Sequence, residues 1–150
     1  FTDSTNLDRK ALDIIKEIIN NCRKRKTPSK AWLDKKAKEL EETIASDDKL
    51  IEVIKAISQI NSKFHKYFAK NFTEFNKLCR NIGYENIVEY KGRFYTIDGK
   101  EQQDLTRYYY KYTYWRKVCR CLSDFVLKLQ QLREQRSPGF SLKLLEKLFT

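Results

Sequence analysis

The sequence predicts an all-α fold with one short β-hairpin, and three observations lead to this prediction. Apolar residues recur three and four positions apart over most of the 150 residues, which is the period of an amphipathic helix. Four glycines and two prolines are too few for the frequent turns of an all-β fold. A hydrophobic fraction of 41% and an aromatic fraction of 13% exclude a disordered chain. We therefore expect a compact, disulfide-stapled bundle of about five to six helices, forming a single helical domain over residues 1–150.

The first two helices are predicted from their apolar faces and boundary residues. Apolar side chains share one face over residues 7–22, and Asn6 or a residue shortly before it is the expected N-cap. The basic run at 23–26 is expected in the last turn, where positive charge suits the helix dipole. Thr27 and Pro28 then match an N-cap followed by the proline favoured at the first helical position. A second helix should therefore follow.

Two more helices are expected between residues 46 and 82. Ser46 precedes two aspartates and opens the third helix, whose apolar stripe continues to Phe68. Asn71, with Glu74 three residues later, matches a capping pattern, so a fourth helix should begin there and stop at Gly83. The same asparagine starts the N-glycosylation sequon Asn-Phe-Thr, whose occupancy the sequence leaves open.

The pattern changes to that of a β-hairpin after residue 83. Residues 87–90 and 93–97 match two short strands joined by Lys91-Gly92. A long helix is predicted from Gln103 to the Ser-Pro-Gly sequence at 137–139, and residues 141–149 should form a short closing helix. Apolar and aromatic residues lie on more than one side of the long helix, which indicates contacts from more than one neighbour.

The four cysteines allow three pairings. Cys119 and Cys121 are two residues apart on a predicted helix, about 200° around its axis, so they should not pair with each other. We expect Cys22 and Cys79 each to pair with one of them, and disulfides would indicate a secreted protein. The alternative is four reduced cysteines in the core. A zinc site is not expected, because these two helical positions cannot direct both thiolates at one ion.

The start of the chain also bears on its location. The chain begins with Phe1 and contains no methionine, although translation starts at a methionine. We therefore expect a secreted, extracellular protein from which a signal peptide has been removed; the alternative is a domain cut from a longer chain. No apolar run approaches the roughly 20 residues of a transmembrane helix, so no such segment is expected.

The charge balance suggests anionic partners. The formal net charge is +11, and Arg23, Lys24, Arg25 and Lys26 resemble a polyanion-binding run. The alternative interpretation of this run is a solvated helix end. A diffuse positive charge favours partners such as heparan sulfate, anionic lipid or nucleic acid, bound with strong salt dependence.

A tyrosine-rich stretch of the predicted long helix is a candidate partner-binding site. Tyrosines and a tryptophan crowd positions 108–115 among basic residues, and at helical spacing some of these rings must face outward. They could line a pocket for an anionic amphiphile, contact a protein partner, or simply complete the core. The expected contact residues, including two from the hairpin, are Phe94, Tyr95, Arg107, Tyr109, Tyr110 and Lys111.

No motif in the sequence points to catalysis. His65 is the only histidine, and no nucleophile or carboxylate motif accompanies it. The chain lacks a Gly-rich phosphate loop, a nucleophile elbow and a zinc-protease motif. We therefore expect a binding protein and not an enzyme, with no catalytic residue, metal or small-molecule cofactor.

One stretch of the chain resembles a known family. Residues 40–68, LEETIASDDKLIEVIKAISQINSKFHKYF, precede an amphipathic segment that ends at Cys79. In this stretch, and in its basic, mainly helical, four-cysteine character, the chain resembles the C-terminal domain of the mosquito salivary aegyptin and anopheline antiplatelet protein family. The acidic, glycine-rich half of those proteins is absent here, and no site residue is carried over. The resemblance implies a secreted protein that blocks a host haemostatic, inflammatory or complement factor, by binding a host protein or lipid mediator.

Overall fold

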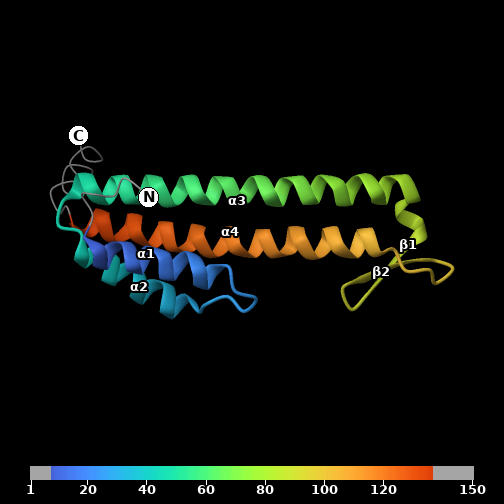
Figure 1. Ribbon diagram of the computed structural model, residues 1–150, viewed down its shortest axis with the longest axis horizontal. Helices are drawn as coiled ribbons and strands as arrows, with labels where there is room; N and C mark the ends of the chain where they lie inside the picture. Colours follow the sequence, from blue (N-terminus) through green and yellow to red (C-terminus); the bar gives the residue numbers. More distant parts are fainter. Residues whose placement is uncertain (1–7, 137–150) are drawn as a thin grey trace, which may run out of the picture. The chain divides into compact units, whose positions relative to one another are not determined.

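A computed structural model describes residues 8–136, and helices make up most of them. The α-helices are α1 (Arg9–Cys22), α2 (Lys30–Thr43), α3 (Asp47–Ile82) and α4 (Gln103–Arg136). The 3-10 turn η1 (Tyr84–Asn86) and an antiparallel hairpin, β1 (Ile87–Tyr90) and β2 (Arg93–Thr96), connect α3 to α4 (Figure 1). The predicted all-α class with one hairpin is confirmed. Within the described residues, no helix has the length and apolar character needed to cross a membrane.

The expected count of five to six helices is wrong: the described residues form four. The main cause is Asn71, which caps no new helix, because α3 continues through it for 36 residues in all. Its side-chain Nδ2 donates to the Tyr67 carbonyl oxygen at 2.8 Å, one turn back along the same helix. Helix α3 ends just before Gly83, whose φ is +96°. A residue with a side chain would be strained in this conformation. The closing helix expected at 141–149 lies outside the described residues.

The chain packs as two compact units, which are described separately below. Of the described residues, unit 1 comprises 8–61 and 120–136, and unit 2 is Ser62–Cys119. Helices α3 and α4 each contribute one part to each unit. The single domain expected over residues 1–150 stays a prediction.

Unit 1 is a helical core of aliphatic side chains. Helix α1 turns one face inward, and α2, the start of α3 and the end of α4 complete the core. Phe125 is its one large ring among the fully buried side chains. The apolar positions that the sequence assigns to the core are buried at Ala11, Ile14, Ile15, Ile18, Leu33, Ala37, Leu40, Ile44, Leu50, Ile54, Ile57, Leu122 and Leu129.

The helix starts in unit 1 differ slightly from those expected. Helix α1 is capped by Asp8, whose carboxylate accepts from the Lys10 backbone N–H at 2.9 Å. Helix α2 is capped by Ser29 and not by Thr27, because the Ser29 hydroxyl accepts from the Trp32 N–H at 3.1 Å. The opening of α3 at Ser46 is confirmed by its backbone and side-chain bonds to the first turn. Local patterns thus predicted the helices, and their exact starts depend on which nearby polar side chain accepts from the first turn.

Two arginines near the end of α4 hold the corner between α2 and α3. Arg133 donates two hydrogen bonds to the Asp47 carboxylate, at 3.0 and 3.2 Å, in a bidentate arrangement. Arg136 pairs with the Glu41 carboxylate at 3.1 Å and donates to the backbone carbonyls of Glu41 and Ile44. These carbonyls lie at the C-terminal end of α2, where, within the described residues, the only backbone donor to either is the Ile44 N–H, which bonds to the Glu41 carbonyl at 3.2 Å.

Unit 2 is held together by aromatic rings. Trp115 of α4 packs against Phe64 and Tyr67 of α3, with ring centroids 5.1 and 4.9 Å apart. One turn earlier on α4, Tyr112 meets Phe72 and Phe75 at 5.1 and 5.2 Å. This order of contacts shows that the two helix segments run antiparallel within the unit. Many aromatic residues of the sequence therefore pack against one another inside unit 2.

The hairpin is anchored to the start of α4. Its predicted Lys91-Gly92 turn is confirmed, with φ angles of 51° and 79° as a tight two-residue hairpin requires. The Phe94 N–H donates to the Thr106 hydroxyl at 3.0 Å, and the Phe94 carbonyl accepts from the Gln102 N–H at 2.7 Å. The hairpin therefore belongs to the body of unit 2.

One of the two expected disulfides is present. Cys22 is bonded to Cys121 with their Cα atoms 5.6 Å apart, which confirms the predicted pairing for Cys22. The prediction that Cys79 also forms a disulfide with one of the two α4 cysteines is wrong, because Cys79 and Cys119 are buried thiols. Since α3 does not break at Asn71, it carries Cys79 to a cluster with Phe94 and Leu105. Cys119 lies 14 helical residues beyond Leu105, which is about 21 Å along α4. Cys79, packed beside Leu105, is therefore far from Cys119.

We expect two of the four cysteines to be alkylated in the unfolded, unreduced protein. Alkylation with iodoacetamide in denaturant, followed by peptide mapping, should label Cys79 and Cys119 and recover a linked Cys22–Cys121 peptide. Without denaturant, labelling of Cys79 should be slow, because burial raises the pKa of its thiol and hinders access. A linked Cys79–Cys119 peptide would contradict the structure.

Removing the disulfide should destabilise unit 1. The bond closes a loop between residues 99 positions apart, for which chain entropy gives a stabilisation of up to about 4–5 kcal/mol. We expect C22A/C121A to lower the free energy of unfolding by about 2–5 kcal/mol in urea denaturation. The matched control is Cys79→Ala. It also removes a buried sulfur, but Cys79 forms no disulfide and so closes no loop. Equal losses for both variants would show that the bond adds nothing beyond packing.

Candidate partner-binding surfaces

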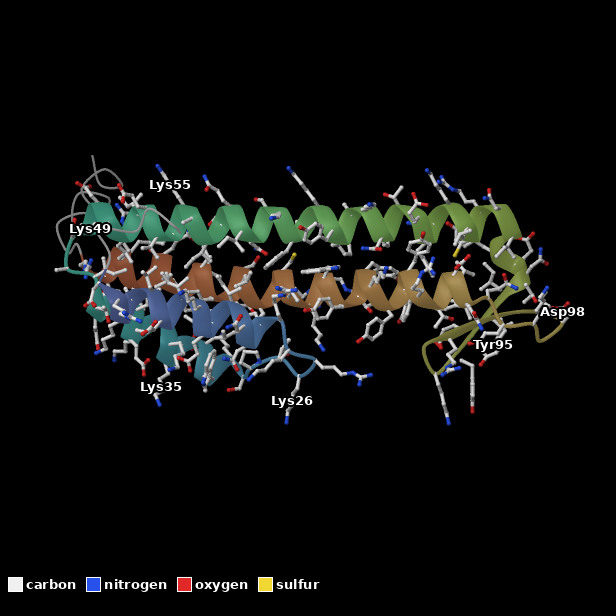
Figure 2. All side chains as sticks on the ribbon, viewed as in Figure 1. Lys26, Lys35, Lys49, Lys55, Tyr95 and Asp98 are labelled. Atoms are coloured by element: carbon white, nitrogen blue, oxygen red, sulfur yellow. A yellow bond between two sulfur atoms is a disulfide. The ribbon has the colours of Figure 1, made fainter. Side chains whose placement is uncertain are left out.

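The six residues expected to contact a partner separate into buried and exposed groups. Phe94 is only 7% exposed and lies in the core of unit 2, where Tyr109 packs against it with ring centroids 5.0 Å apart. Tyr95 is half-buried on β2 (Figure 2). A partner cannot reach the Phe94 ring while unit 2 is folded. Phe94 is therefore a core residue that anchors the hairpin, and not a residue that contacts a partner.

The other three expected residues are exposed on α4. Tyr110 is 56% exposed, and Lys111 beside it is exposed as well. Arg107 pairs with the Asp104 carboxylate at 3.2 Å and lies over the Tyr108 ring, 5.2 Å from its centroid. These contacts stay within one helix, so they leave the outer side of α4 accessible.

The hairpin has an apolar outer face that the sequence analysis did not single out. Val88 pairs with Tyr95 and Tyr90 with Arg93, so these four side chains share one face of the hairpin. Ile97 follows directly after β2, and its N–H donates to the Asn86 carbonyl at 3.0 Å, which extends the pairing by one residue. Val88, Tyr90 and Ile97 are 49%, 61% and 66% exposed. We call Val88, Tyr90, Tyr95 and Ile97 the hairpin outer face.

The inner face of the hairpin explains why the outer one is unusual. Ile87 and Phe94 point to the opposite side and pack in the core with Cys79 and Leu105. An antiparallel sheet with one buried face ordinarily presents polar side chains on the other. Here Ile87-Val88 and Phe94-Tyr95 place an apolar residue on each side. This loss of alternation is the sequence signal that could have identified the outer face.

The basic run lies in the loop after α1. Arg23, Lys24, Arg25 and Lys26 are all exposed, and the side chain of Lys26 points away from the ribbon (Figure 2). Helix α1 ends at Cys22, so the run follows the helix and does not form its last turn as expected. The disulfide at Cys22 ties the base of this loop to α4.

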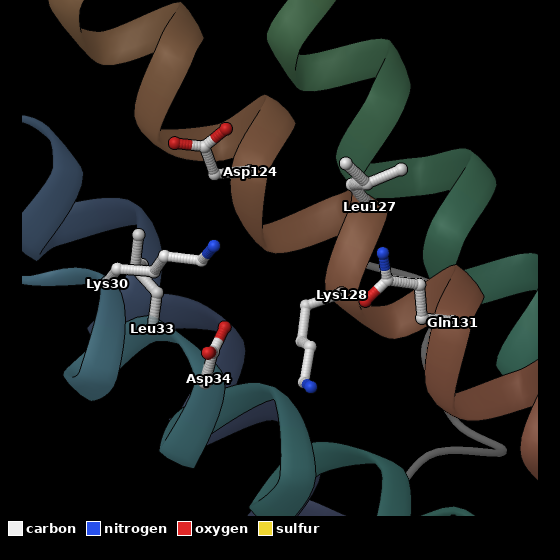
Figure 3. A pocket seen from close by; sticks show the side chains of 7 residues that line it. All are labelled: Lys30, Leu33, Asp34, Asp124, Leu127, Lys128 and Gln131. Carbon is white, nitrogen blue, oxygen red and sulfur yellow. The ribbon is translucent and has the colours of Figure 1, made fainter.

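A hollow between α2 and α4 in unit 1 is too small and too polar for a lipid mediator. Its volume is about 220 Å³, against roughly 300–1,000 Å³ for ordinary ligand pockets, which are mostly apolar. Figure 3 shows two lysines and two aspartates facing it. The lining residues are Lys30, Leu33, Asp34, Asp124, Leu127, Lys128 and Gln131.

The described residues hold no arrangement of metal ligands. No group of three or more histidine, cysteine, aspartate or glutamate side chains within 8–136 could hold an ion. His65 is exposed on α3 and packs against the Phe68 ring at 5.5 Å. The candidate sites of unit 2 are therefore exposed surfaces.

Comparison with known proteins adds no assignment. The chain matches no protein-family model, and searches of curated proteins and of solved structures find no significant similarity.

Two substitutions should distinguish core from surface among the expected contact residues. We expect Phe94→Ala to lower the free energy of unfolding by about 3–5 kcal/mol, because it empties part of the core between Phe75 and Tyr109. Tyr110→Ala should change it by less than about 0.5 kcal/mol, because the ring is mostly exposed. Chemical denaturation of both variants checks this, and similar losses would contradict the division.

Proposed function

We propose that the chain is an extracellular binding protein that blocks or sequesters a protein partner through the hairpin outer face. The observation that carries the proposal is the exposure of Val88, Tyr90 and Ile97 on a hairpin whose opposite face is anchored in the core by Phe94 and the half-buried Ile87. Seven of the eight large exposed hydrophobic side chains among the described residues lie in unit 2. Contiguous exposed apolar surface of this kind is characteristic of interaction sites.

The composition of the surface favours a protein partner over a lipid mediator. Tyrosine and arginine are enriched among residues that dominate binding energy at protein interfaces, and Tyr90 lies beside Arg93 in the ladder. The face belongs to an anchored hairpin, so little conformational entropy would be lost on binding. A lipid mediator would instead need an enclosed, largely apolar cavity.

The disulfide supports the extracellular location. Stable disulfides are typical of secreted proteins and rare in the cytosol, and Cys22–Cys121 joins two buried residues. With the resemblance to salivary antihaemostatic proteins, this makes a host haemostatic, inflammatory or complement factor the proposed target. The role requires no catalysis and no cofactor.

The proposed surface can be tested by selective capture from plasma. The variant V88T/Y90T/I97T removes apolar area but keeps residues that favour strands. We expect immobilised wild-type protein to retain a plasma protein that this variant releases, with affinity lowered by at least about tenfold, as for loss of an interface hot spot. Affinity for the retained protein is then measured by calorimetry.

The matched control for this test lies in unit 1. Leu127 is 54% exposed on α4, and Leu127→Gln removes a comparable apolar group without loss of helix propensity. The control should bind like the wild type, and all three proteins should melt at similar temperatures. Equal capture by V88T/Y90T/I97T and wild type would exclude the hairpin outer face as the binding site.

A polyanion-binding role is the second candidate, and the exposed loop after α1 favours it. Four consecutive basic side chains stand in this loop next to a disulfide that fixes its base. If the loop binds, R23Q/K24Q/R25Q/K26Q should elute from immobilised heparin at clearly lower salt than the wild type, because fewer counterions are released. Elution at unchanged salt would exclude the loop.

A further inference from the structure

One side of α3 in unit 2 carries a line of exposed lysines. Lys63, Lys66, Lys70 and Lys77 are spaced three, four and seven residues apart, so they fall within an arc of about 60° around the helix. They extend over about 21 Å of its length. We call these four residues the lysine stripe. Arg80 extends the line, but its place in the last turn is already explained by the helix dipole.

Acidic neighbours do not balance the lysine stripe. Residues 62–82 contain one acidic side chain, Glu74, which pairs with Lys77 at 3.7 Å. Helix α2, by contrast, carries four basic and four acidic residues, and its Lys36 contacts Glu17 at 3.1 Å and Glu39 at 3.2 Å. Like charges one turn apart weaken an isolated helix, so this imbalance opposes stability. An anionic partner would relieve the repulsion.

The opposite side of α3 is already occupied. Phe64 and Phe75 face the rings of Trp115 and Tyr112 on α4, and Cys79 is buried beside Leu105. The apolar face of this helix segment is therefore unavailable for insertion into a membrane surface. The segment presents to solvent the row of ammonium groups, several polar side chains and the partly exposed rings of Tyr67 and Phe72.

We propose that the lysine stripe binds one linear sulfated polysaccharide chain of the heparan sulfate class, laid along α3. Lysine ammonium groups are compact point charges, suited to a flexible chain of sulfates without fixed bidentate geometry. Single-stranded nucleic acid would call for several rings on which successive bases stack. The one partly exposed ring beside the stripe, Tyr67, already packs against Phe64 and Trp115. In the extracellular location proposed above, which the disulfide supports, sulfated polysaccharides are the common linear polyanions.

This site goes beyond the protein-binding role proposed for the hairpin. It uses different residues on a different element, so loss of one interaction leaves the other measurable. It also differs from the loop after α1, which belongs to unit 1. Binding to the stripe should therefore persist when Arg23, Lys24, Arg25 and Lys26 are neutralised.

The test measures affinity for a heparin oligosaccharide by calorimetry at several salt concentrations. The variant K63Q/K66Q/K70Q/K77Q should bind at least about tenfold more weakly at physiological salt. The slope of log K against log salt should fall by about three to four, close to one for each lost contact. The charge-retaining variant K63R/K66R/K70R/K77R should bind like the wild type. Melting temperatures of both variants confirm that they fold.

A matched variant separates the stripe from net charge. K10Q/K16Q/K35Q/K38Q removes four exposed lysines from α1 and α2 and lowers the net charge equally. This variant should retain nearly all the affinity, and an equal loss would show that only net charge matters. The stripe substitutions are repeated in the loop-neutralised protein, where they should weaken binding by a similar factor. No further loss in that background would assign the binding to the loop and overturn the proposal.

Two further ligands test the chemical class. Desulfated heparin of equal length should bind much more weakly than heparin, because the stripe has lost its sulfate partners. Single-stranded DNA of equal charge should bind the wild type more weakly than heparin does. Tighter binding of the DNA, lost in the stripe variant, would make the site a nucleic-acid site and overturn the proposed class.

Discussion

Helix α3 stays helical through Asn71, and the arrangement of unit 2 depends on this continuity. The asparagine amide donates to the Tyr67 carbonyl instead of capping a new helix. As a result Phe64, Phe68, Phe72 and Phe75 remain in one register and meet the rings of α4 in antiparallel order. A break at this point would have changed that register, the position of Cys79 and the alignment of the lysines on the outer side.

The aromatic packing of unit 2 also shifts where a partner could bind. Tyr109 and Tyr112 face the phenylalanines of α3, so these two rings of the tyrosine-rich stretch take part in packing, whereas Tyr110 stays exposed. The exposed apolar area is found instead on the hairpin, whose inner residues Ile87 and Phe94 are held by the same core. A small hairpin that would be marginal alone is thus supported by the core of unit 2 and can carry exposed apolar side chains.

The two proposed surfaces differ in their physics. Burial of Val88, Tyr90 and Ile97 would be driven mainly by the hydrophobic effect and should depend weakly on salt. Contacts of the lysine stripe would be driven by charge and counterion release and should weaken steeply as salt rises. One chain could therefore bind a protein partner while a polyanion holds it near a cell surface, and salt would separate the two interactions.

The sequence by itself determined the fold class, the hairpin with its Lys91-Gly92 turn and the start of α4. It also determined the buried face of each helix in unit 1. These features follow from local periodicity and turn chemistry. The sequence restricted the partner of Cys22 to two residues by helix geometry together with the expectation that all four cysteines pair, and that expectation is wrong for Cys79 and Cys119. Three features required the tertiary structure: the uninterrupted α3, the isolation of Cys79 from Cys119, and the burial of Phe94 beneath an exposed outer face. A capping pattern at Asn71 is locally as favourable as a helix interior bond to Tyr67, and only the packing of rings on both sides of that residue, against Tyr112 and Trp115, selects the continuous helix.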